Sequence, residues 1–135
     1  MVKVQAFVCR EKDGTYSICA DEKAPINYGL IGEGKTAQEA IDEWNTMYEA
    51  MKSSYEKEGR PFVEASFTFA YDLPSFLSYY GNLITFKGLA KLTGISAAQL
   101  SQYATGYRNP SPKTTAKIQS GLDAFVKELS QVVLV

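Results

Sequence analysis

Few side chains in this 135-residue chain are of a type that could catalyse a reaction. The chain has no histidine, so it lacks the commonest metal ligand and the base of Ser-His and Cys-His catalysis. Its two cysteines, Cys9 and Cys19, flank a predicted hairpin, and the register of the turn decides whether they face each other. A cysteine pair in a reducing compartment usually consists of free thiols, and a redox switch is the alternative.

Carboxylates are the remaining candidates for metal-dependent chemistry. A two-metal nuclease needs several that converge on the ions, typically from the first strand and the central helix. The predicted first strand, residues 2–9, has no Asp or Glu, and four acids of the predicted helix lie mostly off its apolar stripe: Glu39, Asp42, Glu43 and Glu49. The segment GEGK at 32–35 lacks the ending of a phosphate-binding loop. We therefore predict a protein that is not an enzyme, with no catalytic residue, metal site or cofactor.

Residues 85–106 have the pattern of a DNA-binding helix-turn-helix. Thr85 and Ser96 are suited to cap two short helices, and Gly94 lies where the turn between them favours a left-handed backbone. Short polar or methyl side chains are predicted to face solvent on the second helix: Ala97, Ala98, Gln99, Ser101 and Gln102. Glutamine can pair with adenine edges and alanine can contact the thymine methyl group, so this face is predicted to read bases in a major groove.

Charge divides the chain into two parts. Residues 1–72 carry eight Lys/Arg and 13 Asp/Glu, which gives a net charge of −5. Residues 73–135 carry six Lys/Arg and two Asp/Glu, which gives a net charge of +4. Between 85 and 117 there are five cations and no carboxylate: Lys87, Lys91, Arg108, Lys113 and Lys117. DNA affinity depends on local cations that displace counterions from phosphates, so the overall charge of −1 does not argue against DNA binding.

The hydrophobic pattern predicts an α+β fold of two domains. Alternation predicts strands at about 2–9, 16–20, 28–34 and 63–71, with a tight turn at Asp13-Gly14. A helix at 36–59 begins with a capping box of Thr36 and Glu39. Its apolar stripe contains Ala40, Ile41, Trp44, Met47, Tyr48, Met51 and Tyr55. Helices are expected at about 75–81, 86–92, 96–104 and 112–130. The predicted domains are thus a β-β-β-α-β unit at 1–72 and an all-α unit at 73–135.

Residues 83–122, which include GYRNPSPKTTAKI, resemble the Xre/Cro group of repressor domains. The resemblance implies that the early second helix reads bases and that the following loop contacts phosphates. Where that group often has glutamine at the start of the first motif helix, this chain has Phe86, and Thr85 or Lys87 could replace the phosphate contact. The predicted DNA contacts are Thr85, Lys87, Lys91, Ser96, Ala97, Ala98, Gln99, Ser101, Gln102, Tyr107, Arg108, Asn109 and Lys113.

Residues 2–72 resemble the HicB antitoxins, in which a partial RNase H-like unit precedes a DNA-binding domain. The matching features are DGTY at 13–16, GEGKTAQEA at 32–40 and the β-β-β-α-β order. The resemblance implies an antitoxin of a type II toxin–antitoxin system that neutralises a HicA-type mRNA-cleaving toxin and represses its own operator. The alternative is a stand-alone regulator whose N-terminal domain senses a small molecule. A short basic reading frame upstream would favour the antitoxin, and its absence the sensor.

The C-terminal end is unusually apolar. Dimerisation is predicted for Leu129, Val132, Val133, Leu134 and Val135, because a small helical domain is unlikely to cover them all. A homodimer, or a higher even-numbered assembly, would bind an inverted-repeat operator. No apolar run approaches the ~20 residues of a membrane span, and the N-terminus lacks the pattern of a signal peptide, so the expected location is the cytoplasm.

Overall fold

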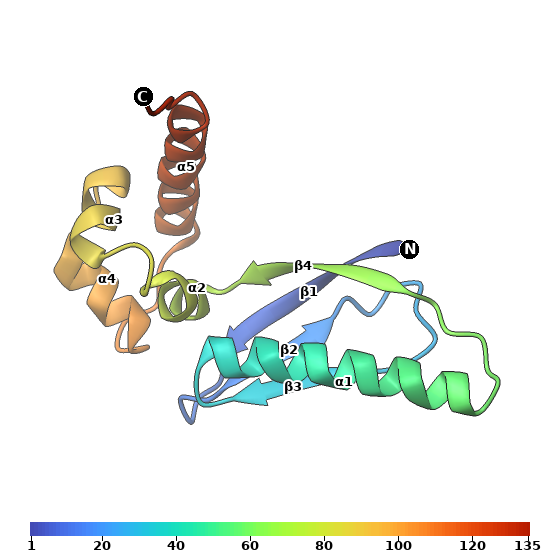
Figure 1. The fold of residues 1–135 in the computed structure, drawn as a ribbon. Helices are drawn as coiled ribbons and strands as arrows, with labels where there is room; N and C mark the ends of the chain where they lie inside the picture. Colours follow the sequence, from blue (N-terminus) through green and yellow to red (C-terminus); the bar gives the residue numbers. More distant parts are fainter. The chain divides into compact units, whose positions relative to one another are not determined.

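In a computed structural model that describes residues 1–135, the chain folds into two compact units, Met1–Tyr79 and Tyr80–Val135 (Figure 1). In chain order the elements are β1 (Val2–Arg10), β2 (Tyr16–Ala20), β3 (Ile31–Gly34), α1 (Ala37–Lys57), β4 (Ala65–Tyr71), α2 (Leu73–Tyr80), α3 (Phe86–Thr93), α4 (Ala97–Ala104) and α5 (Pro112–Leu129). The predicted α+β class and the β-β-β-α-β order are confirmed. No helix has the length and apolarity that crossing a membrane requires.

The first unit contains one four-stranded sheet with the order β3-β2-β1-β4. β1 pairs with β2 in an antiparallel hairpin and with β4 in parallel, and β2 pairs with β3 in an antiparallel manner. The hairpin closes as Asp13-Gly14 predicts, because Gly14 has φ of 87° in the turn. The parallel pair β1–β4 needs a long crossover, and α1 supplies part of it.

Helix α1 covers one face of this sheet (Figure 1). Strand alternation points Ala6, Val8 and Ile18 at this face, where they are buried with Trp44. β3 contributes Gly32, whose backbone lies so close to the helix that an added Cβ would be 2.5 Å from the carbonyl oxygen of Ala40. A larger residue at this position would push α1 away from the sheet, so the sequence GEG is needed for packing.

Several details of the first unit differ from the sequence predictions. β3 and β4 begin later than expected, because Tyr28 and Val63 belong to loops, where the Tyr28 hydroxyl donates to the Val63 carbonyl over 2.8 Å. The side chain of Glu39 accepts from the Lys35 N–H rather than from the Thr36 N–H, although Thr36 caps the helix as predicted.

Met47 is 41 % exposed, although the helical spacing predicts it on the apolar stripe of α1. It lies three positions after Trp44, so its direction is turned by about 60° from that of Trp44. Ala40, Ile41 and Tyr55, also on the stripe, are buried as predicted.

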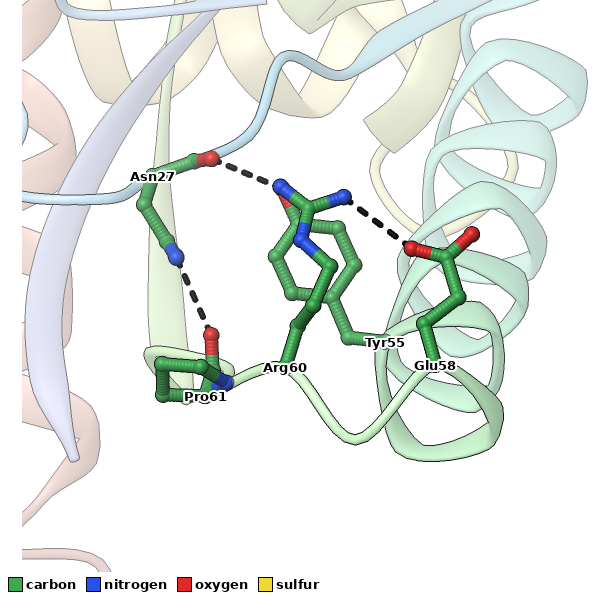
Figure 2. A network of polar contacts seen from close by, with 5 residues as sticks. All are labelled: Asn27, Tyr55, Glu58, Arg60 and Pro61. Carbon is green, nitrogen blue, oxygen red and sulfur yellow. Dashed lines mark hydrogen bonds and ion pairs between the residues drawn. The ribbon is translucent and has the colours of Figure 1, made fainter.

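A polar network holds the C-terminal end of α1 against two loops (Figure 2). The hydroxyl of Tyr55 donates to the carbonyl of Asn27 over 2.8 Å, and the Asn27 amide donates to the carbonyl of Pro61 over 3.0 Å. The Arg60 guanidinium lies 4.2 Å from the centre of the Tyr55 ring and forms an exposed ion pair with Glu58. Exposed ion pairs contribute little to stability, so the part-buried hydrogen bond from Tyr55 contributes more here than the ion pair does.

The break between the units lies seven residues later than the predicted boundary at 72/73. Asp72 joins the end of β1 to the start of α2: its carboxylate accepts from the N–H of Arg10 over 2.8 Å and from that of Ser75 over 2.9 Å. The ring of Tyr79 stacks on Tyr71, with centroids 5.9 Å apart. These contacts keep most of α2 with the first unit. The division of function between 1–72 and 73–135 stays a prediction.

The two cysteines lie on adjacent strands but not opposite each other. Cys9 pairs with Ser17, and Cys19 pairs with Phe7, which makes the cysteines diagonal neighbours. Both are free thiols. Burial and the nearby carboxylate of Asp72 raise the pKa of the Cys9 thiol, so Cys9 is less reactive than an ordinary thiol.

Candidate nucleic-acid interface

Helices α3 and α4 form a helix-turn-helix whose ends are fixed by the residues that the sequence indicates. Thr85 caps α3 by accepting from the Gly88 N–H over 3.0 Å, and Ser96 caps α4 by accepting from the Gln99 N–H over 3.1 Å. Gly94 ends α3 with φ of 75°, in the left-handed region. The predicted turn is therefore confirmed, including the reason for its glycine.

The turn is also held by Thr93, which the sequence analysis did not single out. Its buried hydroxyl donates to the carbonyl of Leu89 over 2.7 Å and accepts from the N–H of Ile95 over 3.2 Å. One side chain thus satisfies backbone groups on both sides of Gly94. A threonine just before a capping glycine is the only sequence signal that could have indicated it.

Helix α5 packs against the turn from the other side. At Gly121 an added Cβ would lie 2.5 Å from the carbonyl oxygen of Leu92, so the two helices touch through backbone. One turn earlier, the Lys117 amine lies 3.3 Å from the place where Gly94 would carry a Cβ. This puts a positive charge beside the negative C-terminal end of α3. Lys117, one of the five cations counted in the sequence, therefore stabilises the motif locally.

The outer face of α4 is small and polar, as predicted. Ala97, Ala98 and Ser101 are exposed, while Gln99 and Gln102 are half-buried. The two glutamines differ in their contacts. The Gln99 Oε1 accepts from the Ser96 hydroxyl over 3.3 Å, whereas no hydrogen bond involves the side chain of Gln102. The Gln102 amide, unlike that of Gln99, therefore has no hydrogen-bond partner within the chain.

The loop after α4 carries the residues expected at phosphates. Gly106 has φ of 77°, and the next residue, Tyr107, is 81 % exposed. The Arg108 N–H donates to the carbonyl of Gln102 over 3.3 Å, which anchors this loop to the end of α4. Arg108 and Asn109 are exposed next to it.

The start of α5 continues this surface. Ser111 caps α5 by accepting from the N–H of Thr114 over 3.1 Å, and Lys113 is exposed in the first turn. A helix N-terminus attracts anions, so a cation at this position adds to a favourable field for phosphate.

Lys91 and Thr85 lie in different surroundings from the other predicted contacts. Both line an open hollow of about 510 Å³ together with side chains of the loop before α3 (Leu83 and Ile84), of α3 (Leu92) and of α5 (Phe125). None of the lining residues belongs to α4. Lys87 is exposed on α3. The structure therefore brings Lys91 together with Phe125 rather than with the outer face of α4.

The C-terminal tail is not covered in the single chain. Leu129 ends α5 and is more than half exposed, and the residues after it form neither helix nor strand. Val133 and Leu134 are 82 % and 90 % exposed. The predicted apolar surface is thus present, and its role in dimerisation stays a prediction.

Comparison with known proteins supports one part of the chain. Residues 85–123 match a protein family described as helix-turn-helix, and the match spans α3, α4 and the first two-thirds of α5. No curated protein and no solved structure matches the chain. The matched range begins at Thr85, the cap of α3, and includes the turn at Gly94 and the whole of α4. The second unit therefore carries a helix-turn-helix of the kind that binds DNA in transcription regulators.

Proposed function

We propose that this protein is the antitoxin of a type II toxin–antitoxin system, which represses its own operator and neutralises a HicA-type ribonuclease. The separation of charge between two compact units carries the proposal. Met1–Tyr79 has a net charge of −5 and Tyr80–Val135 a net charge of +4, so moving the boundary to Tyr79 leaves the predicted charges unchanged. One unit suits a basic protein partner and the other a polyanion.

The proposed DNA site consists of a base-reading face and a phosphate-binding rim. Ala97, Ala98, Ser101 and Gln102 of α4 contact base edges, and Gln99 contributes less because it also serves the cap. The rim contains Thr85, Lys87, Tyr107, Arg108, Asn109 and Lys113. Lys91 completes the proposed site and, like Thr85, lines the hollow beside Phe125.

The proposed assembly is a homodimer or a higher even-numbered oligomer. The exposed tail residues supply the contact: Leu129, Val132, Val133, Leu134 and Val135. A two-fold dimer puts two reader helices on one face of the DNA about one helical turn apart. The operator is then an inverted repeat.

A second candidate function is a regulator whose first unit senses a small molecule. It is favoured by an open hollow of about 1,070 Å³ between the β1–β2 hairpin and the start of α1. The hollow is lined mainly by polar and charged side chains, including Glu11, Asp13, Lys35 and Glu39, so its ligand would be small and polar.

The deciding experiment combines RNA cleavage and DNA binding by the full chain. A small basic protein encoded beside this chain's gene is purified, and its cleavage of RNA is measured with increasing amounts of the full chain. The DNA upstream of the gene is titrated by fluorescence anisotropy. We expect cleavage to stop near stoichiometric addition, and Arg108→Ala to weaken DNA binding while it still stops cleavage. Full cleavage at saturating chain would refute the antitoxin and leave the sensor.

A further inference from the structure

The sheet face opposite α1 has an apolar row that crosses all four strands. In the strand register Ala70 pairs with Phe7, Phe7 with Cys19, and Cys19 with Ile31. Because neighbouring residues such as Ala6 and Ile18 point at α1, the members of this row point the other way. Ile31, a large apolar residue that begins the edge strand β3, is 60 % exposed.

An acidic row lies beside the apolar row, two residues along each strand. Cys9 pairs with Ser17, and Ser17 pairs with Glu33. The Ser17 hydroxyl donates to the carboxylate of Glu11, so two carboxylates flank Ser17. Neither of them takes part in an ion pair: the two salt bridges of the structure join Lys52 to Glu64 and Arg60 to Glu58. Their negative charge is available to a partner.

The two rows together have the composition of a protein-binding surface rather than of a solvated face. Small side chains lie on three sides of Phe7, namely those of Cys9, Cys19 and Ala70, while Gln5 lies on the fourth, so a partner can approach the sheet closely over the small residues. The apolar row can be buried, and the acidic row fixes the sign of the charges opposite it. The outer side of α1 also has carboxylates, but Met47 is its only large exposed apolar residue.

We infer that this face, centred on Ile31 and Glu33, is the surface on which the basic toxin docks. The inference rests on the proposed function, since it names the part of the first unit that the toxin would contact. Lysine or arginine side chains of the toxin lie opposite Glu33 and Glu11, and an apolar patch of the toxin covers Cys19 and Ile31. Covering those cations blocks the surface with which a ribonuclease holds its RNA.

The test compares two matched pairs of substitutions in the full chain. Ile31→Lys is compared with Met47→Lys, and Glu33→Lys with Glu43→Lys, so that each pair makes the same charge change on opposite sides of the unit. We expect Ile31→Lys and Glu33→Lys to weaken binding of the neighbouring basic protein at least tenfold, and the other two variants to change it less than twofold. Fluorescence of the buried Trp44 checks that every variant is folded.

Alkylation of Cys19 by iodoacetamide gives a second readout on the unmodified chain. Cys19 is exposed within the apolar row, and we expect the basic protein to protect it from the reagent. If the parent chain fails to bind the basic protein at all, the proposed function fails.

If all four variants bind the basic protein as tightly as the parent chain does, the proposed docking surface is wrong. If instead Met47→Lys and Glu43→Lys weaken this binding, the docking surface lies on α1. Protection of Cys19 without the basic protein would also overturn the inference. If this protection of Cys19 in the chain alone disappears on dilution, the face binds a second copy of the chain. If it disappears only at high salt concentration, the face binds the chain's own basic unit.

Discussion

The hydroxyl of Ser96 and the side chain of Gln99 are hydrogen-bonded to each other at the start of α4. Ser96 accepts from the Gln99 N–H over 3.1 Å and donates to the Gln99 Oε1 over 3.3 Å. The contact satisfies an otherwise unpaired N–H in the first turn of α4 and restricts the Gln99 side chain. Two glutamines that look equivalent in the sequence therefore differ in their side-chain contacts, because only Gln99 is hydrogen-bonded within α4.

Gln102→Ala is expected to lower the affinity for the operator by on the order of 1–3 kcal/mol and to relax the preference at one base position. Gln99→Ala should cost less, because the side chain already has a partner within the helix. Anisotropy titrations with operators that carry single base changes would measure both effects. Equal losses in the two variants would mean that the Gln99 amide rotates away from Ser96 to reach the DNA.

Arg108→Ala is expected to weaken binding to all DNA sequences about equally and to reduce the slope of log affinity against log salt by roughly one. Arg108 is exposed in the loop that the Gln102 carbonyl anchors, where a phosphate can approach. Lys127→Ala is the matched control, since it removes one cation from the last turn of α5. Titrations at several salt concentrations should separate the two variants, and identical slopes would contradict the proposed rim.

Gly121→Ala is expected to destabilise the second unit by roughly 1–3 kcal/mol, because the new methyl group would lie 2.5 Å from the Leu92 carbonyl. The direction is diagnostic, since glycine to alanine in an open helix position stabilises by about 1 kcal/mol. Thermal unfolding followed by circular dichroism measures the change in stability. Ser120→Ala, at the exposed neighbouring position, is the control. A stabilised Gly121→Ala would show that α3 and α5 separate easily.

Stability of the first unit is expected to fall between about pH 10 and pH 12. Burial, followed by the neighbouring Tyr48, raises the pKa of Tyr28 from 10.0 to about 12. Below pH 10 the Tyr28 phenol is protonated in both the folded and the unfolded chain. Between pH 10 and pH 12 the unfolded chain loses this proton while the folded chain keeps it, so unfolding becomes more favourable.

Tyr28→Phe should flatten this dependence, although it also removes the hydrogen bond to Val63, worth about 1 kcal/mol at neutral pH. Urea unfolding followed by Trp44 fluorescence at pH 9, 10.5 and 11.5 provides the measurement. If the free energy of unfolding of the variant falls with pH as steeply as that of the parent chain, other groups cause the loss of stability at alkaline pH.

Deletion of residues 131–135 is expected to give monomers and to lower operator affinity, while both units stay folded. The removed segment contains four of the exposed apolar residues of the tail, which have no cover within one chain. Light scattering measures the assembly, and circular dichroism checks the fold. A dimer that survives the deletion would show that another surface holds the copies together.

Local chemistry decides most of the secondary structure, and those parts could be predicted from the sequence. Thr36, Thr85, Ser96 and Ser111 cap helices because each side chain bonds to an N–H within the same turn. Gly14 and Gly94 adopt positive φ, which glycine does without steric strain because it has no Cβ. The strand and helix order followed from these signals and from the period of the apolar residues.

The sequence by itself therefore determined the element order, the motif and the opposite charges of the two parts. Tertiary structure alone decided the sheet order and which residues lie opposite one another, because strand pairing joins segments far apart in the chain. The row from Ala70 through Phe7 and Cys19 to Ile31 exists only in that register. Tertiary structure also decided that Lys117 lies beside Gly94 and that Gly121 touches Leu92, since helix packing depends on contacts that no local pattern encodes.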